Sequence, residues 1–86
     1  MTVYLIDEPF TEIGLSIAAD DPTARVVLVQ DAVYRGRDEG IRAGTYAIRD
    51  DVSRRGLLGA LRPGVQVIGY DALVEMMEAE RVVCFL

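Results

Sequence analysis

The chain has 86 residues, of which 51% are hydrophobic and 27% are charged. This length predicts one small domain over residues 1–86, and the apolar fraction excludes a disordered chain. Nine basic and fourteen acidic residues give a net charge of −5, which argues against non-specific nucleic-acid binding, because that function needs clustered positive charge. No apolar run approaches the ~20 residues that cross a bilayer. The first residues also lack the basic start of a secretory signal, so we expect a cytoplasmic protein.

Missing residue types exclude several kinds of chemistry. The chain has no histidine, and its one cysteine is Cys84, so imidazole acid–base catalysis, an internal disulfide and a multi-cysteine zinc site are all excluded. It carries no glycine-rich nucleotide-binding motif. Adjacent acidic pairs occur at residues 7–8, 20–21, 38–39 and 50–51, and we interpret them as solvated loop charges and helix caps. We therefore expect no metal site and no cofactor.

Five short apolar runs predict strands. They lie at residues 3–6, 26–29, 46–48, 65–68 and 82–86. The run Val26 to Val29 is continuously apolar and does not alternate, which is typical of a strand buried on both faces of a parallel sheet.

Helical periodicity separates these runs. Phe10, Ile13 and Ile17 recur at helical spacing and predict a first helix with this apolar stripe. A short helix is expected after Ala32, and another over residues 52–58, with an aspartate at its N-cap. The last helix is expected to be capped by Asp71. Its predicted apolar face comprises Leu73, Val74 and Met77.

Strands and helices thus alternate through the whole chain, with short connections. This order predicts an α/β fold, a three-layer α/β/α sandwich around a mostly parallel sheet of about five strands. The crossover connections should be right-handed.

Two groups of residues are candidates for function. Gln30 and Asp31 end a buried strand, and ligands of open α/β sheets bind outside such ends; the alternative is a turn in which Asp31 caps the next helix. Together with Asp31, Tyr34 and Arg55 are the best candidates for residues that contact a partner, because Tyr and Arg are enriched at binding hot spots. Cys84 lies in an apolar run, where we expect a buried structural thiol; a reactive, persulfide-carrying thiol is the alternative.

Three segments carry a family resemblance when taken in order. They are Val27-Leu28-Val29-Gln30-Asp31-Ala32-Val33-Tyr34, the stretch Tyr-Ala-Ile-Arg-Asp-Asp-Val-Ser-Arg-Arg-Gly-Leu at residues 46–57, and Val-Ile-Gly-Tyr-Asp-Ala-Leu-Val at residues 67–74. Together they resemble the TusB/DsrH family of sulfur-relay subunits, within the DsrE/DsrF/DsrH superfamily. The resemblance covers nearly the whole chain.

The resemblance implies a compact α/β/α subunit that assembles with TusC and TusD, or with DsrE and DsrF. Such complexes pass persulfide sulfur, in the Tus case toward 2-thiolation of the wobble uridine of tRNA, and the main sulfur-accepting cysteine belongs to the TusD or DsrE subunit. Some DsrH-type members also carry a cysteine in the first helix, whereas residues 16–18 here contain none, and Ala32 replaces the usual glycine. These departures favour a structural or docking subunit without catalytic residues. A stand-alone persulfide carrier using Cys84 and a homo-oligomeric binding module for another ligand are the alternatives.

Overall fold

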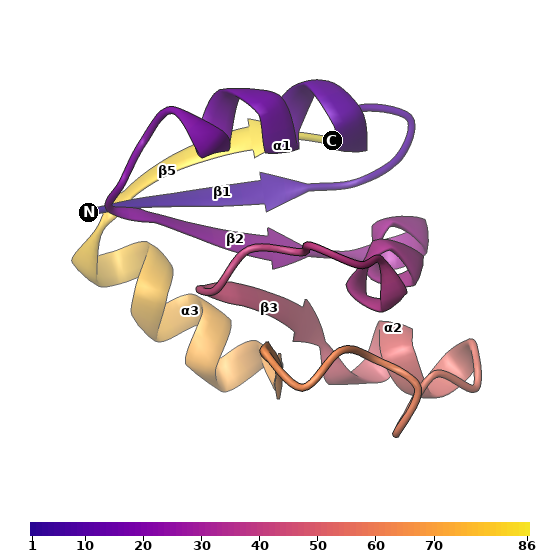
Figure 1. Ribbon diagram of the computed structural model, residues 1–86. Helices are drawn as coiled ribbons and strands as arrows, with labels where there is room; N and C mark the ends of the chain where they lie inside the picture. Colours follow the sequence, from indigo (N-terminus) through magenta and orange to yellow (C-terminus); the bar gives the residue numbers. More distant parts are fainter.

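The computed structural model describes all 86 residues, which form five strands that alternate with helical segments (Figure 1). The elements are β1 (Thr2–Ile6), α1 (Thr11–Ala19), β2 (Ala24–Leu28), the 3₁₀ helix η1 (Gln30–Arg37), β3 (Thr45–Ile48), α2 (Arg49–Arg54), β4 (Val65–Ile68), α3 (Tyr70–Ala79) and β5 (Arg81–Phe85). No helix combines the length and the apolar character that crossing a membrane requires.

The five strands form one sheet in the order β4-β3-β2-β1-β5. Every neighbouring pair is parallel, so the prediction of a mostly parallel α/β fold is confirmed, and the sheet is in fact parallel throughout. The chain steps from β1 to β4 in one direction. The segment that contains α3 then returns across the sheet and places β5 beside β1.

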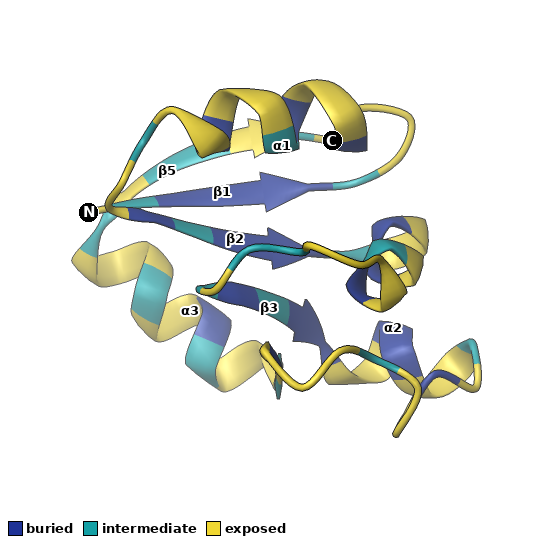
Figure 2. Cartoon of the chain, viewed as in Figure 1, coloured by how far each residue is buried: buried dark blue, intermediate teal, exposed yellow.

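The two faces of the sheet bury separate apolar clusters. Figure 2 shows β1, β2 and β3 as mainly buried, whereas β5 and the outer sides of the helices are more exposed. One cluster joins Tyr4 and Ile6 of β1 to residues of α1, η1 and α2. The other joins Val3 and Leu5 of the same strand to Leu73 of α3. Strands β1 and β2 are therefore covered on both faces, as the unbroken apolar run of β2 predicts.

The side of α1 that faces the sheet differs from the prediction. Thr11, Gly14 and Ala18 are buried, whereas the predicted apolar stripe lies outside. The stripe residues Phe10, Ile13 and Ile17 are between 42% and 55% exposed. Small side chains let the helix backbone approach β1 closely: a Cβ atom added to Gly14 would lie 2.9 Å from Cδ1 of Ile6. The periodicity located the helix correctly but selected the wrong face.

Helix α3 shows a similar difference. Leu73 is buried and Met76 packs beside it against the sheet, while Val74 and Met77 of the predicted face are exposed. The helix begins at Tyr70, so Asp71 lies in its first turn and does not cap it. The prediction located the helix, but only Leu73 of the expected face is buried.

Helix α2 begins at Arg49, three residues before its predicted start. Asp50 and Asp51 consequently lie in its first turn, where a negative charge stabilises the positive end of the helix dipole. The predicted N-cap aspartate is wrong, because the chain turns into the helix directly after β3.

Cys84 is exposed, which corrects the expectation of a buried thiol. It lies on β5 next to Leu5 of β1, and β5 has no neighbour on its outer side. Helix α3 reaches β5 at the start of the strand, since only Glu80 separates them. Cys84 lies in the carboxyl half of β5, away from this end of α3.

Candidate functional site at the carboxyl edge of the sheet

The carboxyl ends of β2 and β3 lie side by side because these strands are neighbours in the sheet. Strand β2 leads into η1 at Gln30, and β3 leads directly into α2. In open parallel sheets, ligands bind outside these ends. This edge brings the predicted residues Asp31 and Arg55 together.

Gln30 adopts a left-handed backbone conformation, with φ of +50°. Its main-chain N–H donates a 2.8 Å hydrogen bond to Oδ2 of Asp51 on α2. The Asp51 side chain is only 1% exposed, and its Oδ1 atom has no hydrogen-bond partner. Left-handed backbone is costly for a residue other than glycine, so the surrounding contacts must hold it. We infer that Asp51 performs this role.

Arg55 connects α2 to η1. Its Nε and Nη2 atoms donate hydrogen bonds of 3.1 Å and 2.9 Å to Oδ1 of Asp31. Its Nη1 atom donates a 3.1 Å hydrogen bond to the main-chain oxygen of Asp51 and lies 3.8 Å from Oδ1 of the same residue. Asp31 nevertheless remains 68% exposed. Arg55 thus orients a carboxylate that solvent or another protein can reach.

Asp51 was not singled out as a site residue in the sequence. It lies in an adjacent acidic pair that fits a helix cap equally well. Only the contact across two strand ends distinguishes Asp51 from the exposed Asp50, and no local pattern encodes that contact.

Tyr34 lies on η1, within the same short helix as Asp31, and its side chain is exposed. The guanidinium carbon of Arg37 lies 5.2 Å from the centre of its ring, which is a cation–π arrangement. No hydrogen bond joins Tyr34 to Asp31 or Arg55. The three predicted interface residues therefore share one end of the molecule, but only Asp31 and Arg55 touch.

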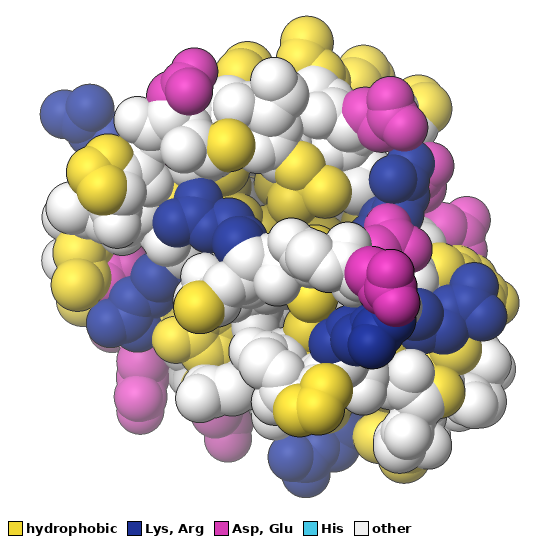
Figure 3. All heavy atoms as spheres, viewed as in Figure 1, with side chains coloured by type: hydrophobic (Ala, Val, Ile, Leu, Met, Phe, Trp, Pro, Cys, Tyr) yellow, Lys and Arg dark blue, Asp and Glu magenta, His cyan; other side chains and the backbone are white.

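Arg35 of η1 pairs with acidic residues of α1 and of the loop before it. It forms ion pairs with Glu8 and Glu12, at 4.0 Å and 3.4 Å, and with Asp38 at 3.7 Å. Acidic and basic side chains alternate over this region of the surface (Figure 3). Exposed pairs of this kind each contribute about 0–1 kcal/mol. The single guanidinium of Arg35 offsets only part of the charge of its three acidic partners.

Cys84 lies away from this cluster. Strand β1 separates β5 from β2, and two strands separate β5 from β3. The structure therefore does not combine the thiol with Asp31, Arg55 or Asp51. No group of three or more cysteine, aspartate or glutamate side chains is placed to hold a metal ion.

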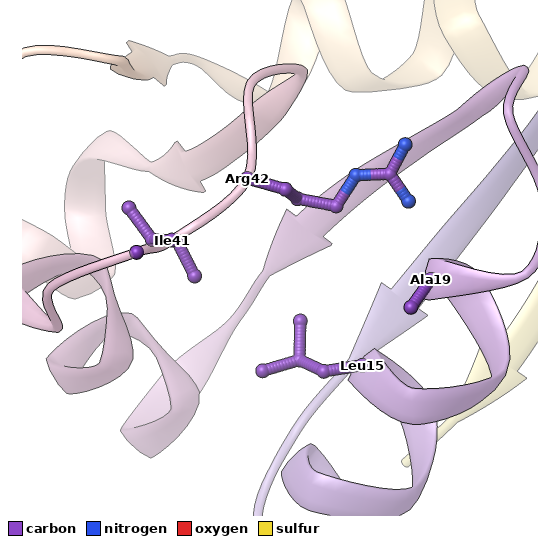
Figure 4. Close-up of a pocket in the computed structure, with 5 residues that line it drawn as sticks. Leu15, Ala19, Ile41 and Arg42 are labelled. Carbon is purple, nitrogen blue, oxygen red and sulfur yellow. The ribbon is translucent and has the colours of Figure 1, made fainter.

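A small hollow of about 180 Å³ lies between α1 and residues 40–42 (Figure 4). Leu15, Ala19 and Ile41 line it together with Gly40 and Arg42. Arg42 donates a 2.7 Å hydrogen bond from Nη1 to the main-chain oxygen of Ala18 near the end of α1. The hollow therefore combines three apolar side chains with one guanidinium, and none of its lining residues is a nucleophile or an acid.

The fold and the carboxyl-edge cluster define a small α/β protein with a fully parallel five-strand sheet. A comparison with protein families matches residues 9–83 to the family described as DsrH like protein. Because the match covers most of the chain, the chain belongs to the DsrH-like family, as the ordered sequence segments predict. A comparison with curated proteins finds no match.

Proposed function

We propose that this chain is a non-catalytic, cytoplasmic subunit of a sulfur-relay complex of the DsrEFH or TusBCD type. The complex would pass persulfide sulfur toward 2-thiolation of the wobble uridine of tRNA. The match to the DsrH-like family over residues 9–83 carries this proposal. On this proposal, residues 1–86 form one DsrH-like domain, and a DsrE- or TusD-like sibling supplies the sulfur-accepting cysteine.

The carboxyl-edge cluster supports a positional role. Asp51 is buried and accepts a main-chain hydrogen bond, and Arg55 is engaged by two aspartates. Neither group is free to attack a substrate or to exchange a proton with one. The cluster is suited to holding η1 in place, which is what a docking subunit requires.

We propose Asp31, Tyr34 and Arg55 as the interface residues for the sibling subunits. Arg55 fixes the exposed Asp31 carboxylate, so a partner's donors meet an oriented acceptor. Tyr34 adds an exposed aromatic ring beside Arg37. An aromatic residue next to ordered charges is the composition found at binding hot spots.

Native mass spectrometry of the tagged protein, recovered from its own cell lysate, tests the proposal. We expect a complex with two identified siblings, one DsrE- or TusD-like and one DsrF- or TusC-like. Recovery of the chain by itself, as a monomer, would contradict the subunit role. Recovery as a homo-oligomer would favour the alternative of a homo-oligomeric binding module.

The same assembly measurement tests the interface residues. Tyr34→Ala and Arg55→Ala should each weaken assembly by at least about tenfold, the effect of a hot-spot residue. Arg54→Ala is the matched control, because Arg54 is an exposed neighbour that forms no ion pair. If the control weakens assembly as much as the two variants, the assignment is wrong. Circular dichroism of each variant separates lost assembly from lost folding.

One observation favours a second candidate function, the persulfide carrier. Cys84 is exposed on an edge strand, so a donor can reach its sulfur. In that reaction the Cys84 thiolate attacks the outer sulfur of a donor persulfide, a new S–S bond forms, and the donor leaves as a thiolate. Intact mass after incubation with a persulfide donor checks this reaction. An adduct that persists in Cys84→Ser, or no adduct on the wild type, rules it out.

A further inference from the structure

We propose that α3 carries a docking surface for a protein partner whose apolar residues are bordered by arginine or lysine. The proposal is independent of the interface at the carboxyl edge. Three exposed apolar side chains of α3, Tyr70, Val74 and Met77, form what we call the α3 stripe. Their spacing of four and three residues places them on one side of the helix.

The α3 stripe is separate from the side of the helix that packs on the sheet. Leu73 and Met76 face the sheet, whereas the stripe residues are between 38% and 50% exposed. Contiguous exposed apolar side chains, when bordered by polar residues, mark interaction surfaces. The fold of the isolated chain therefore does not use the α3 stripe.

An acidic row follows the α3 stripe along the same helix. Asp71, Glu75 and Glu78 are exposed and repeat with the same spacing. None of the three forms an ion pair within the chain, and α3 contains no basic residue. In Figure 3, acidic side chains project at the lower left, where Figure 1 places α3. The acids around η1 differ, because Glu8, Glu12 and Asp38 all form ion pairs with Arg35.

This charge distribution determines the class of partner. Three uncompensated carboxylates repel the phosphates of RNA and the headgroups of anionic lipids. They attract a surface that carries arginine or lysine beside apolar groups, and complementary charge both steers and selects such a partner. A second copy of this chain brings a net charge of −5, which opposes self-association through this surface.

Helix α3, which carries the stripe, lies on the opposite face of the sheet from α1, η1 and α2 (Figure 1). Its first residue, Tyr70, follows the carboxyl end of β4, and α3 runs from there along the opposite face toward the start of β5, away from the carboxyl edge. A partner on α3 therefore does not compete with one that contacts Asp31 or Tyr34. The chain has two docking surfaces that can be occupied together.

The test uses a synthetic amphipathic helical peptide of leucine and lysine, with a leucine–glutamate peptide of equal length as its control. Isothermal titration should show binding of the lysine peptide to the wild type and none of the glutamate peptide. Glu75→Lys combined with Glu78→Lys should weaken binding by at least about tenfold. Val74→Ser should weaken it by about threefold or more, since it removes an apolar contact.

The control variant carries Asp20→Lys and Asp50→Lys, which change the net charge equally but lie outside α3 on exposed positions. It should bind the lysine peptide within about twofold of the wild type. Equal loss in this control and in the α3 double variant would show that net charge alone attracts the peptide, and would overturn the proposal. Unchanged affinity in the α3 variants, or wild-type self-association that the α3 double variant abolishes, would also overturn it. Sibling assembly is measured separately, so its outcome does not affect this test.

Discussion

The main-chain N–H of Gln30 donates a 2.8 Å hydrogen bond to Oδ2 of Asp51, whose side chain is almost completely buried. Gln30 begins η1 directly beyond β2 and Asp51 lies in the first turn after β3, so this bond connects the segments that follow the carboxyl ends of two neighbouring strands. It connects the first residue of η1, the helix that carries Asp31 and Tyr34, to α2.

Asp51→Ala should destabilise the protein by about 1–3 kcal/mol, because it removes a buried carboxylate that accepts the part-buried Gln30 N–H bond and lies beside the Arg55 guanidinium. Asp50→Ala, which alters the exposed neighbour in the same turn, should change the free energy of unfolding by less than about 0.5 kcal/mol. Urea denaturation of both variants gives the comparison. Similar small losses in the two variants would show that the Gln30–Asp51 bond contributes little to stability.

Gly14→Ala should destabilise the protein, although alanine is the better helix former by about 1 kcal/mol. The new Cβ would lie 2.9 Å from Cδ1 of Ile6, a fully buried residue, so either the Ile6 side chain or α1 must shift within a packed core. We expect a net loss of about 1–3 kcal/mol in thermal or urea unfolding. Gly64→Ala is the matched control, because an added Cβ there meets no atom within 4 Å. A stabilised Gly14→Ala protein would contradict the packing of α1.

Ile13→Gln should leave stability within about 0.5 kcal/mol of the wild type, because the side chain is exposed on the outer side of α1. Leu28→Ala, which truncates a fully buried residue of β2, should cost about 2–5 kcal/mol. Chemical denaturation of each variant distinguishes these effects. A large loss of stability in Ile13→Gln would mean that the predicted apolar stripe of α1, which contains Ile13, does pack on the sheet.

Asp21 should contribute to the pH dependence of stability. Hydrogen bonds from the hydroxyl and the main-chain N–H of Thr23, at 2.8 Å and 2.9 Å, lower the pKa of the Asp21 carboxyl below its ordinary value. A lowered pKa in the folded state stabilises the protein above the ordinary carboxyl pKa. That contribution is lost as the pH falls through the folded-state pKa. A carboxyl NMR titration checks the shift, and Thr23→Ala should raise the Asp21 pKa toward its ordinary value. An unchanged pKa in that variant would exclude the Thr23 hydroxyl as a cause, since the main-chain N–H of residue 23 is retained.

Tyr4 should contribute to the pH dependence of stability at alkaline pH, with the opposite sign to Asp21. Burial is the first cause that raises the pKa of its phenol, and the 3.0 Å hydrogen bond that the hydroxyl donates to Oδ2 of Asp21 acts in the same direction. A raised pKa stabilises the folded state below the ordinary phenol pKa, and the contribution disappears as the pH rises through the folded-state pKa. Unfolding of Tyr4→Phe and the wild type, compared across this range, should show the pH dependence only in the wild type.

Cys84 should react with a thiol reagent in the folded protein, because its side chain is exposed on β5. Intact mass in native buffer should show one label per chain, and the Cys84→Ser control should show none. A thiol that reacts only after addition of denaturant would mean that the β5 edge is covered, either by α3 or by association with another chain.

Local sequence patterns were sufficient for the order of elements. The apolar runs at residues 65–68 and 26–29 predicted β4 closely and most of β2, since a short β-branched run between turn residues has few other stable conformations. Alternation of such runs with helical segments predicted the parallel sheet. The ordered segments around Gln30 and Asp71 were also sufficient to identify the family, which the match over residues 9–83 confirms.

Tertiary packing decided which sides of these elements are buried and which side chains meet. Periodicity predicted that the large residues Phe10, Ile13 and Ile17 form the buried side of α1. The small Gly14 and Ala18 face β1 instead, because they allow the helix to approach the strand more closely. The exposure of Cys84 follows from the edge position of β5, which depends on the return of the chain across the whole sheet. Asp51 meets Gln30 only because β2 and β3 are neighbours. Contacts between residues far apart in the chain arise from the arrangement of all the strands together, and no local pattern specifies that arrangement.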